Sequence, residues 1–148
     1  ITSLAFLWPK LSGGFGGKID AGDIGEIKNA IFQPDGSIEP FYVAEAKTYV
    51  VPFDESLLSQ TDFDGIDVVV EGLTGLLQKC VHLGCRVPEC LSSQGFECPC
   101  HGSKYNAHGE YDSGPAPRNL DRFGVSVDAA GSSDALTGEE TETAVHMT

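Results

Sequence analysis

Short runs of β-branched and aromatic residues, separated by turn signals, make up most of the hydrophobic pattern between residues 18 and 128. Runs of this kind are typical of strands in a mainly β protein. The clearest of them are 41–43, 48–51, 66–71 and 75–79, and the last of these leads directly to Cys80. Shorter strands are expected at 96–97, 103–105, 110–111 and 125–127.

Helical signals are few and short. Asp23 precedes a run at 24–31 that predicts about two helical turns, and Asp54 is placed as the N-cap of a short helix at 54–59. Pro34-Asp35-Gly36 is a strong turn signal, and 62–65 predicts another turn. The pattern therefore predicts one mainly β domain at 18–128.

The two ends of the chain differ from this domain. Residues 4–8 are apolar and end in Trp8, which is typical either of the last turn of a membrane helix or of an arm packed on the domain. The glycine cluster at 13–17 is typical of a flexible hinge, or of an ordinary loop. We expect 1–17 to be the end of a membrane anchor whose helix lies upstream of residue 1. We expect 129–148, rich in Ala, Gly, Ser, Thr and Glu, to be a disordered acidic tail.

Composition narrows the function classes. The 148 residues include 18 glycines, which favours a loop-rich β protein, and no stretch reaches the roughly 18 apolar residues that span a bilayer. The net charge of −13 argues against nucleic-acid binding, which requires a basic face. It fits docking onto a basic electron-transfer partner, and it fits equally a charge that keeps the protein soluble.

Two short boxes carry the candidate chemistry: Cys80-Val81-His82-Leu83-Gly84-Cys85 and Cys98-Pro99-Cys100-His101-Gly102. They hold four of the five cysteines and two of the four histidines. A [2Fe–2S] cluster in which His replaces both Cys on one iron needs one thiolate and one imidazole from each box. Cys80 and Cys98 would hold one iron, and His82 and His101 the other. Gly84 and Gly102 allow tight turns around the cluster.

Two plainer interpretations compete with the cluster. Zinc binds two Cys and two His in many small sites, but Cys-x-His is tighter than a common zinc knuckle and leaves Cys85 and Cys100 without a role. A framework made of disulfides alone does not require a His in each box.

From about residue 70 to 127 the chain resembles the Rieske iron–sulfur proteins of cytochrome bc-type complexes. The resemblance rests on the two boxes followed by Gly114-Pro115-Ala116-Pro117-Arg118, which is similar to the proline loop of that family. Val81 departs from the family, in which Thr is common at this place. The resemblance implies a Rieske-type antiparallel β sandwich with a small cluster-binding subdomain at about 79–118.

The resemblance also implies residue roles. Cys80, His82, Cys98 and His101 would bind one [2Fe–2S] cluster, and Cys85 and Cys100 would form a disulfide, which requires an oxidising, extracytoplasmic compartment. Cys90 would then be free, pair between molecules, or compete with Cys100 for Cys85. His108 is expected to have a structural role and His146 to be exposed. Hydroxyls of Ser103 and Tyr105 would raise the midpoint potential.

The function that the resemblance implies is electron transfer in the respiratory chain. The chain would be the iron–sulfur subunit of a membrane quinol–cytochrome c reductase, with cytochrome b and a c-type cytochrome as partners. His82 and His101 would be the catalytic pair, because a His ligand would take up a proton as the cluster takes an electron. Leu83, His101 and Pro115 would dock the quinol.

Two alternatives remain open. One is the Rieske small subunit of an arsenite-oxidase-like enzyme, which also carries a disulfide, although Ser103, Tyr105 and the apolar segment at 4–8 favour the reductase. A soluble Rieske ferredoxin that feeds an oxygenase is the third hypothesis, and the pair Cys85 and Cys100 argues against it.

Overall fold

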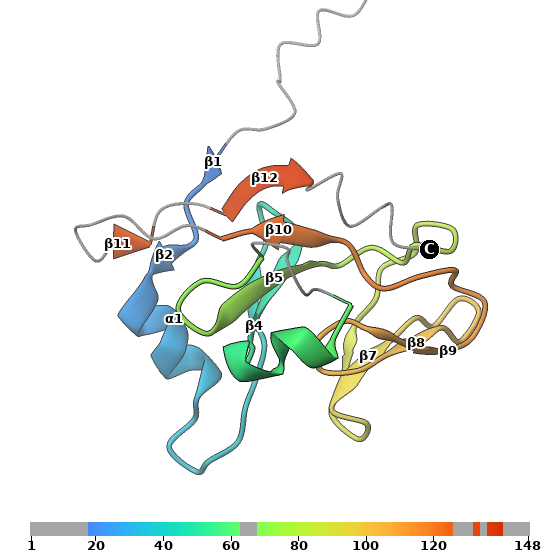
Figure 1. Ribbon diagram of the computed structural model, residues 1–148, viewed down its shortest axis with the longest axis horizontal. Coiled ribbons are helices and arrows are strands. Elements are labelled where there is room, and N and C mark those ends of the chain that lie inside the picture. Colours follow the sequence, from blue (N-terminus) through green and yellow to red (C-terminus); the bar gives the residue numbers. More distant parts are fainter. Residues whose placement is uncertain (1–17, 63–67, 126–131, 134–135, 141–148) are drawn as a thin grey trace, which may run out of the picture.

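The computed structural model describes residues 18–62, 68–125, 132–133 and 136–140, which form three antiparallel sheets (Figure 1). The largest sheet has the strand order β1-β12-β10-β5-β4-β3. Its strands are Lys18–Ile19 (β1), Leu136–Glu140 (β12), Arg122–Gly124 (β10), Leu73–Leu77 (β5), Thr48–Pro52 (β4) and Phe41–Val43 (β3). The mainly β class expected from the sequence is confirmed.

A four-stranded sheet, which we call the small sheet, carries both boxes on its connections. Its order is β6-β7-β8-β9, formed by Glu89–Cys90 (β6), Gly95–Glu97 (β7), Lys104–Tyr105 (β8) and Tyr111–Ser113 (β9). A separate pair joins Gly22–Asp23 (β2) to Ser132–Ser133 (β11). Every strand pair in the three sheets is antiparallel.

Both expected helices form where their caps place them. The Asp23 carboxylate accepts hydrogen bonds from the amides of Gly25 and Glu26, and the helix α1 runs over Ile24–Ile31. Asp54 caps η1, a 3₁₀-helix at Glu55–Gln60, in the same way. Within the described residues, neither helix is long and apolar enough to cross a membrane.

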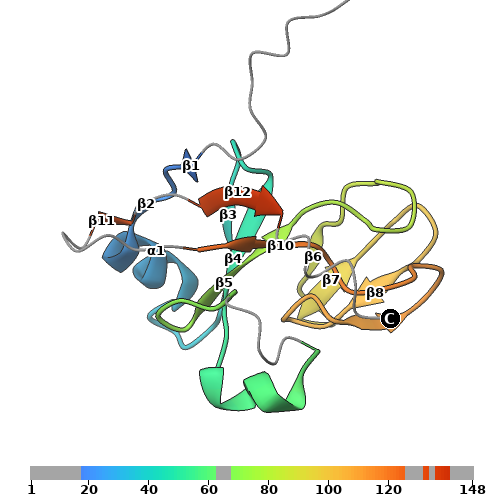
Figure 2. The same cartoon turned by 45° about the horizontal axis from the view of Figure 1, so that its top comes forward.

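Two clusters of buried side chains hold the sheets together. One packs α1 on the large sheet and contains Ile27, Ile31 and Leu73. The other joins the large sheet to the small sheet, and Cys80 and Cys98 are part of it together with Tyr49, Leu76, Phe96 and Leu120. Figures 1 and 2 both place α1 and the small sheet at opposite ends of the large sheet. The second cluster therefore packs directly against both boxes, because Cys80 and Cys98 belong to it.

The small sheet is a single insertion between two neighbouring strands of the large sheet. β5 ends at Leu77 and β10 begins at Arg122, and these two strands pair with each other, Leu76 opposite Arg122. Everything from residue 78 to 121, including both boxes and the proline loop, lies between them. The candidate site is thus built from one continuous stretch of chain.

Arg122 links the two sheets from inside the protein. Its side chain is 1% exposed, and its guanidinium donates to the Thr74 hydroxyl at 3.1 Å and to the His108 backbone carbonyl. The Phe53 ring lies 5.8 Å from the guanidinium carbon and packs against the His108 ring. These contacts agree with the structural role expected for His108.

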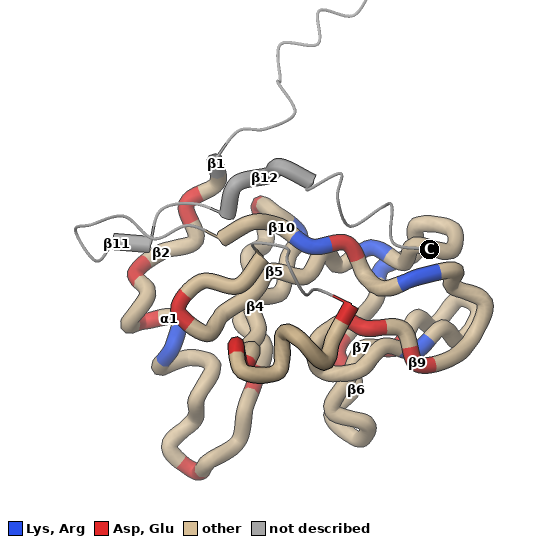
Figure 3. The backbone as a smooth tube through the Cα atoms, in the orientation of Figure 1, with Lys and Arg blue, Asp and Glu red and all other residues tan. Residues whose placement is uncertain are grey.

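Charged residues are distributed unevenly between the stretch 79–122, which carries the boxes, and the rest of the chain. The stretch 79–122 contains five basic residues (Lys79, Arg86, Lys104, Arg118 and Arg122) and five acidic residues (Glu89, Glu97, Glu110, Asp112 and Asp121). The net charge of −13 therefore belongs to the rest of the chain. Figure 3 shows the basic positions concentrated toward the small sheet.

Several expected strands differ from the observed ones. The strand at 66–71 is wrong for its described part, because Glu71 (φ 51°) and Gly72 (φ 75°) reverse the chain and leave Val70 in an isolated bridge with Leu73. Of the strand expected at 125–127, only Val125 is described, and it follows β10 at Arg122–Gly124. The strand expected at 75–79 spans Leu73–Leu77.

The tail also differs from its expectation. Residues 132–133 and 136–140 form β11 and β12 where disorder was expected, because β10 offers an open edge with which β12 pairs. The expected anchor and hinge at 1–17, and the turn at 62–65 beyond Asp62, lie outside the described residues.

Candidate functional site

The two boxes fold into loops with the same backbone hydrogen bonds. In the first, the Cys80 amide donates to the Cys85 carbonyl and the Gly84 amide donates to the Cys80 carbonyl, both at 2.8 Å. In the second, the Cys98 amide donates to the Ser103 carbonyl at 2.8 Å and the Gly102 amide to the Cys98 carbonyl at 3.0 Å. Each loop closes through a glycine at positive φ, 80° at Gly84 and 77° at Gly102, a conformation that side chains with a Cβ rarely adopt.

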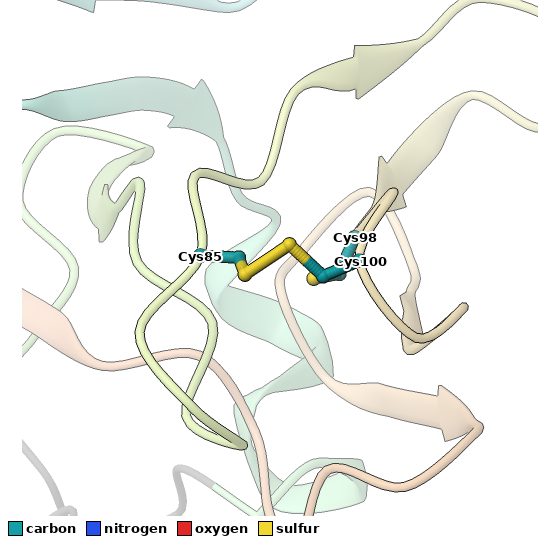
Figure 4. A group of neighbouring side chains, drawn as sticks. All are labelled: Cys85, Cys98 and Cys100. Atoms are coloured by element: carbon teal, nitrogen blue, oxygen red, sulfur yellow. A yellow bond between two sulfur atoms is a disulfide. The ribbon is translucent and has the colours of Figure 1, made fainter.

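Three sulfur atoms meet where the loops face each other. Cys85 and Cys100 are joined by a disulfide, as expected, and it ties the first loop to the second (Figure 4). The Cys98 sulfur lies within 4.8 Å of both. Distance alone would make these three a metal-binding group, but sulfurs bonded to each other are poor ligands, because the thiolate is the form that binds metal. Cys98 is the member that remains available.

The free cysteines in the boxes are buried and the histidines are close together. Cys80 and Cys98 are each 2% exposed and are not in a disulfide. The rings of His82 and His101 have centroids 4.9 Å apart and planes at 86°. Nδ1 of His82 is buried and has no hydrogen-bond partner among the described residues. A buried nitrogen without a partner is costly, and a metal ligand bond would satisfy it.

The two buried thiols oppose each other electrostatically. Burial raises the pKa of Cys80, but hydrogen bonds, the strongest of them from the Tyr105 hydroxyl at 3.4 Å, outweigh burial and leave that pKa below its usual value. Burial and the neighbouring Cys80 sulfur raise the pKa of Cys98. Deprotonation is therefore easier at Cys80 than at Cys98, and a nearby cation would favour the thiolate form of both. Iron supplies that charge, so two thiolates and two imidazoles fit a cluster ligated by both residue types.

The stretch 114–118 covers a further side of this site. Ser103 is fully buried, and its hydroxyl oxygen accepts a hydrogen bond from the Ala116 amide at 3.1 Å. Gly114 has φ 100°, and a Cβ added there would lie 2.6 Å from the Ser103 Cα. The Tyr111 hydroxyl donates to the Gly114 carbonyl at 2.7 Å. These contacts hold the proline loop against the second box. The sequence placed Gly114 in the proline loop and Tyr111 in a short strand, but it indicated neither of their contacts. The Gly-Pro dipeptide was the signal for the turn, but not for its packing.

The outer face of the loops is apolar. Leu83, at the tip of the first loop, is 71% exposed, and Pro115 and His101 are also exposed. Half-buried Val81 packs against the cluster of buried side chains that contains Cys80. Cys90 is free and lies on β6, with its sulfur 3.2 Å from the Ser92 hydroxyl. It does not compete for Cys85.

Comparisons with known protein families, sequences and structures all point to Rieske proteins. Residues 34–124 match the sequence profile of the Rieske [2Fe-2S] domain. The cytochrome b6-f complex iron-sulfur subunit 2 of Synechocystis sp. (strain ATCC 27184 / PCC 6803 / Kazusa) is 34% identical over 124 residues, which cover 80% of this chain and 62% of that protein. The cytochrome b6-f complex iron-sulfur subunit of Synechococcus sp. (strain JA-2-3B'a(2-13)) is 50% identical over 54 residues, 36% of this chain and 31% of that one.

Among solved structures, the soluble domain of the Rieske protein II (soxF) from Sulfolobus acidocaldarius has a similar fold. Its TM-score is 0.56 at 20% identity, and the alignment covers 85% of this chain and 79% of that one. The chain matches less than two thirds of the length of the two cyanobacterial relatives.

Proposed function

Because this chain belongs to the Rieske [2Fe-2S] domain family, we propose that it transfers single electrons through a cluster ligated by Cys80, His82, Cys98 and His101. The observation that carries the proposal is that two loops joined by a disulfide hold two buried cysteines outside that disulfide and two adjacent imidazoles, one of which has a buried nitrogen without a partner among the described residues. One [2Fe–2S] cluster is the cofactor of this family. When bound, it supplies a one-electron acceptor whose potential lies between roughly −150 and +300 mV.

Within this general role in electron transfer, we propose a specific one: the chain is the iron–sulfur subunit of a complex of the quinol–cytochrome c reductase or cytochrome b6-f type. The names of the two cyanobacterial relatives support this role. In it the chain takes electrons from a quinol held against cytochrome b and passes them to a c-type cytochrome. The disulfide supports an extracytoplasmic position, since disulfides persist in oxidising compartments. It also supports this role over an oxygenase-type ferredoxin.

The residues at the loop tips would handle the substrate. Leu83 and Pro115 are apolar and exposed, and His101 is exposed as well, so that together they would offer a surface on which a quinol head group can lie with little water. The ring nitrogen of His101 that does not bind iron would accept the hydroxyl proton of the quinol, since quinol oxidation releases protons together with electrons. His82, which is only half-exposed, would play the smaller part in this contact.

Metal analysis, spectroscopy and titration with a quinone test the proposal. We expect two irons and two sulfides per chain and an EPR signal of mixed nitrogen and sulfur ligation on reduction. In a complex reassembled with cytochrome b, that signal should change when a quinone is added. His82→Ala and His101→Ala should each abolish the signal. Stoichiometric zinc, or an unchanged signal in both His variants, would exclude the ligand set. A signal of the reassembled complex that does not change with quinone would exclude the role as the subunit of a quinol-oxidising complex, and it would leave the ligand set standing.

A further inference from the structure

The end of the small sheet farthest from the boxes carries a cavity of about 360 Å³. It lies between residues 36–40, the end of β4 and the β6–β7 hairpin, whose loop is 91–94. Cys98 follows β7 directly, so the hairpin loop and the second box lie at opposite ends of that strand. The candidate electron-transfer site makes no use of this cavity.

The cavity has a fixed apolar floor and an exposed apolar rim. Val51 and Phe96 line it and are each 1% exposed. Ile38 and Leu91 also line it, and they are 55% and 75% exposed. Exposed apolar side chains that flank a hollow are typical of a surface that binds another molecule.

Two carboxylates give the cavity its charge. Glu39 and Glu89 both line it, and neither has an ion-pair partner among the described residues. Burial, and then the charge of Glu39, raise the pKa of Glu89. Two like charges beside apolar side chains repel each other, and a cation between them would relieve that repulsion.

We propose that this cavity binds an arginine or lysine side chain of a partner protein, whose neighbouring apolar residues pack on Ile38 and Leu91. The positive charge complements Glu39 and Glu89, and the aliphatic stem suits the apolar walls. A small organic cation that only fills the cavity would leave the exposed rim uncovered, which is why a protein segment fits better. A second copy of this chain, with its net charge of −13, would be repelled.

The position of the cavity separates this partner from the redox partners. A segment bound at the β6–β7 hairpin leaves Leu83, His101 and Pro115 free, because they lie at the other end of the small sheet. The partner can therefore stay bound while the electron-transfer face exchanges its own partners. The contact would anchor the domain and would not carry electrons.

An NMR titration of the oxidised holoprotein tests the proposal. The probe is the capped peptide acetyl-Gly-Leu-Arg-Leu-Gly-amide, and its matched control replaces Arg by uncharged citrulline. We expect saturable shifts of the Gly36, Leu91 and Gly95 amides with the Arg peptide and at least tenfold weaker binding of the citrulline peptide. Glu89→Gln should weaken binding of the Arg peptide about tenfold, which corresponds to about 1.4 kcal/mol.

Two further variants keep the test decisive. Leu91→Ser removes an exposed rim side chain and should weaken binding without altering the fold, whereas Glu45→Gln removes an exposed charge away from the cavity and should leave binding unchanged. The proposal would be overturned if Glu89→Gln bound the Arg peptide as tightly as the unaltered protein does. It would also be overturned if the shifted amides lay elsewhere on the surface, or if binding did not saturate at millimolar peptide. Binding of n-propylguanidine as tight as that of the peptide would reassign the cavity to small cations and would also overturn it.

Discussion

At the scale of single residues, two hydroxyls act on the sulfur of Cys80. The Tyr105 hydroxyl lies 3.4 Å from it, and Tyr105 and Ser103 both lower the pKa of the Cys80 thiol. A donor that favours a charged sulfur also favours the reduced site, because reduction adds negative charge there.

We therefore expect Tyr105→Phe and Ser103→Ala each to lower the midpoint potential by about 50–100 mV, within the energy of a hydrogen bond to a charged group. Voltammetry of the folded holoprotein measures the change. Tyr42→Phe, which removes a hydroxyl bound to Gln78 instead, is the control and should leave the potential unchanged. If both variants retain the cluster and neither potential falls, these hydroxyls do not tune the site.

Glu89 makes a second prediction at this scale, on stability against pH. Folding raises its pKa, so the folded chain is relatively most stable when Glu89 is protonated and loses that advantage as the pH rises through the pKa. We expect Glu89→Gln to unfold at a higher temperature than the unaltered chain at about pH 7, with a difference that shrinks toward about pH 4. Thermal unfolding across this range measures it. The same increase in Glu45→Gln would attribute the effect to net charge and not to the cavity.

At the scale of elements, the disulfide is the contact that fixes one loop relative to the other. It closes a loop with a sequence separation of 15 residues, for which chain entropy predicts about 3 kcal/mol of stability. Cys85→Ser and Cys100→Ser should each lower the free energy of unfolding by about that amount and shorten the lifetime of the cluster.

Decay of the visible absorbance in the presence of an iron chelator follows this lifetime. Cys90→Ser is the matched control, since it removes a cysteine that lies outside the disulfide and outside the ligand set. A cluster as long-lived in Cys85→Ser as in Cys90→Ser would show that the loops do not depend on the bond.

The elements also show what a sequence can specify. α1 was predicted to follow Asp23, and η1 was predicted with Asp54 as its N-cap, because the bond from a capping Asp to an amide two or three residues later is a local interaction. The two boxes were identified for the same reason. The pairing of β12 with β1 joins residues more than a hundred positions apart, and no local pattern encodes it. The described part of the strand expected at 66–71 was wrong, because its valines fit a buried strand whereas Glu71, at positive φ, reverses the chain.

The contacts that shape the site could not be predicted from the sequence either, because they also join residues that are not neighbours in the chain. Ser103 was singled out as a donor to sulfur, but its hydroxyl oxygen also holds the Ala116 amide, 13 positions away. The close packing of Gly114 on Ser103 depends on how β8 and β9 pair.

At the scale of the whole molecule, Arg122 is the buried link between the large sheet and the insertion. Burial lowers its pKa, and the charge of Glu110 partly offsets that effect. Arg122→Met should lower the free energy of unfolding by about 3 kcal/mol, because the buried Thr74 hydroxyl and the part-buried His108 carbonyl lose the guanidinium that donates to them. Urea denaturation measures the loss. Arg118→Gln, which breaks an ion pair with Asp121 nearer the surface, should cost about 1 kcal/mol or less. Equal losses in both variants would contradict the role of Arg122.

The insertion of 78–121 between two paired strands has a consequence for engineering. Its first and last residues leave adjacent strands, with the Leu77 amide bound to the Asp121 carbonyl at 2.8 Å. A segment whose ends already meet can be exchanged as a cassette, because closing it requires no rearrangement of the strands outside. Related cassettes with other loop lengths or ligands could be grafted onto this sheet, provided that they cover Tyr49, Val51 and Leu76. The large sheet would then be a shared scaffold for redox centres of different midpoint potential.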